Sequence, residues 1–161
     1  MAMLAELVRS DPTPDAAFPK GRVIVSRFGP IVVQPTTAIS FPSGLLGFPG
    51  LRDYALASLP DERFNRFLVL QSLEDDGVAF LVQALDPDQG LIAAADLNEM
   101  CALLDVPREH LALLLIVSIR RHAEKAVLTV NLRAPLVVNA QRRRGVQHVL
   151  SNGVYPIRHV L

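Results

Sequence analysis

The length and composition of the chain fit one folded domain and exclude several classes of protein. It has 161 residues, half of them hydrophobic, which is enough for a single domain with a buried core. Sixteen basic and sixteen acidic residues balance, so the overall charge does not favour binding to nucleic acid. The longest apolar run, residues 111–117, is much shorter than the roughly 20 residues of a membrane-spanning helix.

The chain's start and its one cysteine indicate where the protein works. Cys101 has no second cysteine to pair with, which favours a reducing compartment. Residues 1–9 lack the basic start and long apolar core of a signal peptide, so we expect a soluble, cytoplasmic protein. Three X-Pro steps predict that residues 1–20 form a flexible extension. A helical turn over residues 4–8 would be either a frayed terminus or a partner-binding helix.

Short apolar, β-branched runs separated by turn residues predict strands through the first half of the chain. The predicted strands cover residues 22–28, 31–33, 36–41, 54–59, 66–73, 78–85 and 91–94. Between the fifth and sixth, three acidic residues precede Gly77, and the Asp-Gly step predicts the positive φ angles of a tight hairpin. These acids are either a solvated hairpin tip or a cation site.

One helix and further strands are predicted in the second half. Asp96 and Glu99 form a capping-box pattern, and apolar residues at helical spacing predict a helix over residues 96–104, with Cys101 packed on its apolar side. Residues 111–119 are apolar at nearly every position, which predicts a central strand covered on both faces. A charged turn over 120–125 separates it from the later strands. These later strands are predicted over residues 126–130, 136–139, 146–150 and 155–160.

No group in the sequence stands out as reactive. Glycines recur in residues 41–50, but no lysine and no predicted helix follows them, so a turn-rich loop is favoured over a phosphate cradle. The four histidines lack zinc-ligand spacing, although His148 and His159 are able to meet on neighbouring strands. No catalytic residue, metal site or cofactor is therefore predicted. One rival hypothesis is an enzyme with a deep polar pocket in the mouth of a barrel.

A run of three arginines, Arg142, Arg143 and Arg144, is the strongest local charge feature. It is either a solvated turn, a protein-facing patch or the contact of an RNA-binding module. Exposed aromatic residues, which usually accompany such charge in single-strand RNA readers, are missing from this hairpin. Amide side chains stand at strand ends and corners of residues 129–155, where they tie irregular backbone together or meet a partner's backbone. These amides are Asn131, Asn139, Gln141 and Gln147.

Several of these segments together resemble the FliW family of flagellar assembly factors. The segments are residues 39–45 with Gly47 and Phe48, Leu70-Gln71-Ser72, and residues 129–136 followed by Asn139, Gly145, Gln147 and Tyr155. The resemblance runs from about residue 22 to the C-terminus and leaves the extension outside. Members of the family are often acidic, whereas this chain is neutral.

The resemblance implies a mainly β fold, a small antiparallel β-barrel-like single domain over residues 21–161 with one or two short helices. It implies no catalysis. It implies instead a regulator that binds flagellin and, when flagellin is exported, binds the CsrA-type RNA-binding repressor and keeps it off its messenger. Residues expected to contact these partners or to shape the loops are Phe41, Pro42, Gly44, Phe48, Gln71, Asn131, Pro135, Asn139 and Gln147.

Overall fold

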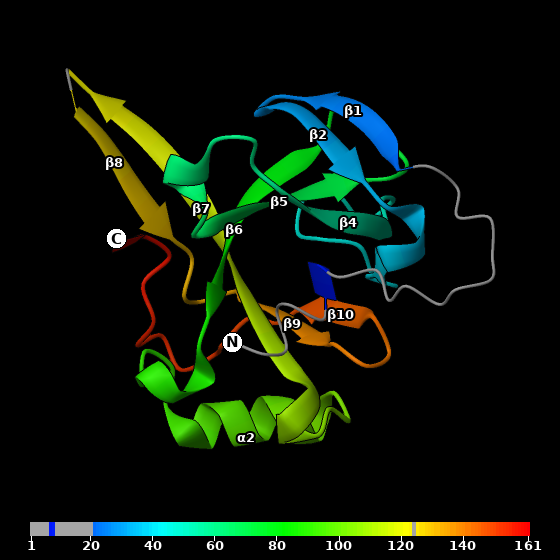
Figure 1. Ribbon diagram of the computed structural model, residues 1–161. Helices are drawn as coiled ribbons and strands as arrows, with labels where there is room; N and C mark the ends of the chain where they lie inside the picture. Colours follow the sequence, from blue (N-terminus) through cyan, green and yellow to red (C-terminus); the bar gives the residue numbers. More distant parts are fainter. Residues whose placement is uncertain (1–6, 9–20, 124) are drawn as a thin grey trace.

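The strands of the protein form a closed barrel with an added hairpin (Figure 1). The computed structural model describes residues 7–8, 21–123 and 125–161. The strands are β1 (Arg22–Ser26), β2 (Gly29–Val33), β3 (Ile39–Ser40), β4 (Asp53–Ser58), β5 (Phe67–Ser72), β6 (Ala79–Leu85), β7 (Leu111–His122), β8 (Lys125–Val130), β9 (Leu136–Asn139), β10 (Arg144–Gln147) and β11 (His159–Val160). The described elements also include the helix α2 (Ala94–Leu103) and the short 3₁₀ turns η1 (Pro35–Thr37), η2 (Glu62–Phe64), η3 (Pro87–Gln89) and η4 (Arg108–His110).

The barrel closes because β7 pairs with three other strands. It lies beside β6 and β8, and its first residues also pair with β9. The ring therefore runs β7-β6-β5-β4-β3-β10-β9 and back to β7. All these pairings are antiparallel except β10 with β3, which is parallel and consists of Arg144 opposite Ser40. The predicted mainly β, barrel-like fold is confirmed, with this parallel junction as an addition.

Three apolar clusters follow from the alternation of side chains along the barrel strands. One fills the interior and includes Phe41, Tyr54, Leu114 and Leu136. A second lies outside the barrel and includes Leu113 of β7 with residues of α2 and the C-terminal segment. The third lies outside β4 and β5, where the β1–β2 hairpin packs. Residues 111–117 therefore serve two clusters at once, and the predicted central strand is confirmed as covered on both faces over these residues, whereas Ser118 and Ile119 at its predicted end are exposed.

Several predicted element boundaries in the first half of the chain are wrong. The strand expected over 36–41 is reduced to β3, because Pro35 opens the 3₁₀ turn η1 and Thr37 Oγ1 bonds to the Gln34 carbonyl. The strand expected over 91–94 is absent, since α2 already begins at Ala94. Its N-cap residue is Ala93 rather than Asp96, so the predicted capping box does not form.

The later boundaries differ as well. Strand β7 continues through His122, so most of the expected charged turn is strand, and β7 and β8 form a long hairpin (Figure 1). Strand β10 starts inside the arginine run and ends at Gln147, while the final strand is only the two residues of β11. The described part of the chain includes no helix long and apolar enough to cross a membrane.

Candidate functional site

Gln147 joins the two segments that carry most of the predicted site residues. Its Oε1 accepts a hydrogen bond from the backbone N–H of Leu46 at 2.9 Å, and its Nε2 donates to the carbonyl oxygen of Ala134 at 3.3 Å. Leu46 belongs to the glycine-rich loop of residues 41–50, and Ala134 belongs to the corner between β8 and β9. One amide therefore holds a loop and a corner that are far apart in the sequence in a fixed relation, since Leu46 precedes Gln147 by 101 residues.

Asn131 and Asn139 shape the two turns on either side of β9. Asn131 Oδ1 accepts hydrogen bonds from the backbone N–H groups of Arg133 and Ala134, both at 3.1 Å. Asn139 Oδ1 accepts from the N–H of Arg142 at 3.0 Å. Such short side-chain bonds to the following backbone are the usual way in which asparagine fixes a turn. Pro135, also a predicted site residue, is buried in the same corner.

The loop of residues 41–50 is built around two fixed contacts. Phe41 is fully buried, meets Tyr54 edge to face at 5.7 Å, and lies so close to Gly145 that a Cβ there would come within 2.6 Å of its ring. Gly44 has φ +68°, and a Cβ on it would collide with the Phe48 carbonyl oxygen. Phe48 packs edge to face on Phe80 at 5.4 Å. The predicted turn-rich loop folded over its own apolar side chains is confirmed for Leu45, which is buried, but not for Leu46, which is exposed.

Gln71 also holds turn backbone by hydrogen bonds, but it does so in the turn between β5 and β6. It is completely buried in β5, and its Nε2 donates to carbonyl oxygens of Ser72 (3.1 Å), Asp76 (3.2 Å) and Val78 (3.1 Å). These bonds form the β5–β6 turn, and Gly77 in that turn does not have the positive φ that the sequence predicted. Gln71 is therefore a loop-shaping residue away from the other predicted site residues.

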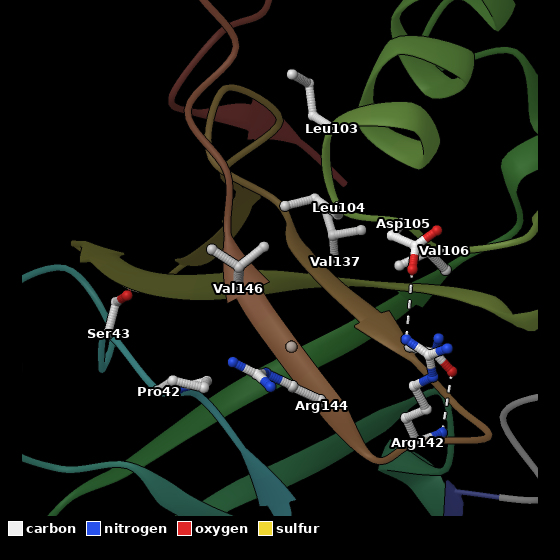
Figure 2. Close-up of a pocket in the computed structure, with 12 residues that line it drawn as sticks. Pro42, Ser43, Leu103, Leu104, Asp105, Val106, Val137, Arg142, Arg144 and Val146 are labelled. Carbon is white, nitrogen blue, oxygen red and sulfur yellow. Dashed lines mark hydrogen bonds and ion pairs between the residues drawn. The ribbon is translucent and has the colours of Figure 1, made fainter.

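A shallow groove of about 330 Å³ lies next to the fixed turns (Figure 2). Leu103 and Leu104 at the end of α2 form one side, and Pro42 and Ser43 of the loop lie on the opposite side. The remaining lining residues are Asp105, Val106, Val137, Asn139, Arg142, Arg144, Gly145 and Val146. Two predicted site residues, Pro42 and Asn139, thus line this groove, whereas the other seven support its surroundings or lie elsewhere.

The groove combines an apolar floor with a charged rim. Val137 and Val106 are buried, Val146 and Leu104 are half-buried, and Leu103 is 64% exposed. Arg142 Nη1 lies 3.5 Å from Asp105 Oδ2 across the rim, and both side chains are largely exposed, so this ion pair contributes at most about 1 kcal/mol. The sequence argument did not single out Leu103. The sequence feature that marks Leu103 is its position next to, but not within, the apolar stripe of residues 97, 100, 101 and 104, which predicts an exposed leucine.

The arginine run is not a simple solvated turn. Arg143 has φ +48°, and its Nη1 donates to the carbonyl oxygens of Thr37 (3.0 Å) and Leu7 (3.3 Å). Arg142 faces Asp105, and the exposed Arg144 lines the groove. The three guanidinium groups therefore have different surroundings. The prediction of a solvated tip is wrong for Arg143, because its charge is used to hold backbone carbonyls.

The groups with displaced pKa values lie outside the groove. Burial, with a smaller contribution from the charge of Glu74, raises the pKa of Tyr54 to about 12. Burial, followed by the hydrogen bond to Asp96, also raises the pKa of Tyr155. Backbone N–H groups of Asp53 and Arg52 lower the pKa of Glu74. These shifts accompany buried or turn-forming groups, and none marks an acid–base pair facing the groove.

The described residues also contain no cluster of potential metal ligands. No group of three or more His, Cys, Asp or Glu side chains in that part of the chain is arranged to hold an ion. The alternative in which His148 and His159 meet on neighbouring strands is wrong. His159 in β11 pairs with Val130 of β8, whereas the His148 N–H donates to the Pro135 carbonyl in the corner.

The fold and the groove together define a small, closed, mainly β barrel with a shallow apolar groove. Beside the groove lies the corner of residues 131–135, whose backbone is held by the side chains of Asn131 and Gln147 and which we call the tied corner. Comparison with known proteins gives this barrel a family. Residues 22–161 match the family described as FliW protein. The chain is 36% identical over 141 residues to a flagellar assembly factor FliW of Syntrophus aciditrophicus, covering 86% of this chain and 85% of the relative. It is 33% identical over 135 residues to another from Caldanaerobacter subterraneus, covering 82% and 87%. The chain belongs to the FliW family.

A solved structure agrees on the fold. The crystal structure of a flagellar assembly factor FliW superposes with a TM-score of 0.66 at 24% sequence identity, covering 86% of this chain and 96% of that one. The tied corner, the loop of residues 41–50 and the groove all lie inside the matched region, whereas Leu7 lies outside it.

Proposed function

We propose that this chain is a non-enzymatic flagellar assembly factor that acts in the cytoplasm by binding other proteins. Membership of the FliW family supports the flagellar role, because its relatives are named flagellar assembly factors. The groove supports protein binding as the mode of action. Its apolar floor and charged rim have the anatomy of a small protein–protein contact.

The partners we propose are flagellin and the CsrA-type repressor, as the sequence resemblance implies. The observation that carries the binding proposal is Leu103, a large apolar side chain that is 64% exposed and lines the same groove as the floor residues Val137 and Val146. Exposed apolar groups next to a preformed hollow are typical anchors of an interface, because covering them removes apolar surface from water. Arg144 and Arg142 on the rim then set orientation and encounter rate.

The alternative of an RNA-binding module has less support from the described residues. Arg143 is engaged with carbonyl oxygens of Leu7 and Thr37, and Arg142 faces Asp105. A turn that offers phosphate its full charge needs its guanidinium groups directed to solvent. We therefore assign the arginine run to the shape and rim of the groove.

The proposal is tested with Leu103→Asp and the matched control Leu91→Asp. Both leucines are exposed, at 64% and 39%, but Leu91 precedes α2 and lies outside the groove. Isothermal titration with purified flagellin, and separately with the repressor, should show at least about tenfold weaker binding of one or both partners for Leu103→Asp and no change for the control. Unchanged affinities for both partners would remove the groove from the function.

Partner switching adds a second requirement. If flagellin and the repressor act in opposition on one small domain, each must weaken the other by the same factor, about 5–150-fold for a useful switch. The loop of residues 41–50 is our candidate for the coupling element, since it lines the groove through Pro42 and is tied to the corner through Leu46. Repressor affinity should be measured with and without saturating flagellin. A stable ternary complex with unchanged affinity would rule out the switch.

A further inference from the structure

The described residues that precede β1 include one that belongs to the interior of the barrel. Leu7 and Val8 are helical, and Leu7 is completely buried. It is a member of the interior cluster together with Phe41, Tyr54 and Leu136, whereas Val8 packs against that cluster and is half-buried. A residue from outside the barrel strands thus completes the packing inside the barrel.

The position of Leu7 is at the end of the barrel formed by the β9–β10 turn and the start of β7. Arg143, in that turn, donates to the Leu7 carbonyl at 3.3 Å. Two interior residues at the same end are alanines: Ala140, whose N–H donates to the His110 carbonyl, and Ala112, opposite Val138. Small interior side chains leave volume at the end of a barrel, and close packing requires that this volume be filled.

The same arginine holds the added segment and the barrel together. The Arg143 guanidinium bridges the Leu7 carbonyl and the carbonyl of Thr37, the last residue of η1. Its backbone has φ +48°, a conformation that costs free energy for a residue other than glycine and that persists where surrounding contacts over-determine it. This end of the barrel therefore offers a buried apolar position, which the Leu7 side chain fills, and a charged donor, the Arg143 guanidinium, which binds the Leu7 carbonyl. We call this combination the plug site.

The occupant of the plug site comes from outside the family match, which begins at residue 22. Ala112, Ala140 and Arg143 lie within that match, so the site belongs to the barrel while Leu7 is an addition. We propose that the plug site is a binding site for a leucine-type side chain on a helical peptide segment, and that Leu7 is its resident competitor. A protein partner that inserts such a side chain must first displace Leu7.

The test asks whether the plug can be supplied by a separate molecule. The probe is a fluorescently labelled synthetic peptide of residues 1–10, and binding is followed by anisotropy. Full-length Leu7→Asp protein, whose own plug is disabled, should bind the peptide about 10- to 150-fold more tightly than the unchanged protein does, since burial of a leucine is worth that factor. Full-length Leu91→Asp is the matched protein control and should behave like the unchanged protein. A peptide carrying Leu7→Asp should fail to bind.

A folded Leu7→Asp protein that ignores the peptide, or that binds the Leu7→Asp peptide equally well, would overturn the proposal. If Leu7→Asp does not fold, full-length Leu7→Ala replaces it, since it removes the plug side chain without introducing charge. A Leu7→Ala protein that again ignores the peptide would also overturn the proposal. Neither flagellin nor the repressor is used, so this result is independent of the proposed function.

Discussion

The tied corner and the groove are neighbours, yet their residues do opposite things. In the corner, the side chains of Asn131 and Gln147 form hydrogen bonds with backbone groups of the protein itself. In the groove, Leu103 leaves most of its apolar side chain in solvent, and Val146 is half-buried. The residues that are chemically distinctive in the sequence thus hold the shape. Ordinary apolar residues at the end of a helix and on a short strand provide the surface for a partner.

The largest expected effect tests the barrel that both regions share. Leu114 is completely buried in β7, opposite Ala84 of β6 and Leu136 of β9. We expect Leu114→Asp to cost several kcal/mol by placing an unpaired carboxylate inside the barrel, which is enough to unfold a domain whose whole stability is about 5–15 kcal/mol. Thermal melting followed by circular dichroism measures this. A cooperative transition at the normal temperature would show that β7 is not the central strand.

The next effect separates two adjacent arginines, one of which holds the shape while the other lines the groove. Arg143→Gln removes the guanidinium from the Leu7 and Thr37 carbonyls, and we expect a loss of about 1.5–3 kcal/mol. Arg144→Gln changes an exposed rim residue and should alter stability by no more than about 0.5 kcal/mol. Urea denaturation of both variants gives the comparison. Equal losses of unfolding free energy in the two variants would mean that the contacts of Arg143 do not contribute to stability beyond those of an exposed arginine.

A smaller effect is expected in the corner itself. Asn131→Ala leaves the N–H groups of Arg133 and Ala134 without their acceptor and should cost about 1–2 kcal/mol of stability. At temperatures where the variant stays folded, it should keep its affinity for the partners, in contrast to Leu103→Asp. Calorimetry of unfolding and of binding on one preparation gives both numbers. Lost binding with normal stability would move Asn131 from the corner into the interface.

The smallest effect concerns pH and a turn away from both regions. Backbone N–H groups hold the pKa of Glu74 below its ordinary value, so folding is favoured by the ionised carboxylate. This contribution is present above the pKa of the unfolded chain and is lost as the pH falls through the lower pKa of the folded protein. Glu74→Gln should therefore reduce the acid sensitivity of the melting temperature below about pH 5. A Glu74→Gln protein with an unchanged acid profile would contradict this.

Local order in this protein was readable from its sequence. Short β-branched runs predict the two strands of the β1–β2 hairpin, helical spacing predicts α2, and the apolar run of residues 111–117 predicts a strand covered on both faces. The side chains of Asn131 and Asn139 accept hydrogen bonds from the backbone two to three residues further on, one of the two roles that the sequence offered for amides at strand ends and corners. Each of these inferences depends on neighbours within a few positions, where backbone sterics and side-chain periodicity determine the outcome.

Only the tertiary structure decided how the barrel closes and what its ends present. The parallel contact of Arg144 with Ser40, the pairing of β7 with β9, and the hydrogen bond from the Leu46 N–H to Gln147 Oε1 join segments that are not neighbours along the chain, and no local pattern encodes them. The same holds for Leu7, which residue spacing marks as an ordinary leucine in a proline-rich extension. Its burial depends on a space left by strands more than 100 residues away, because close packing is a property of the assembled interior and not of any one segment.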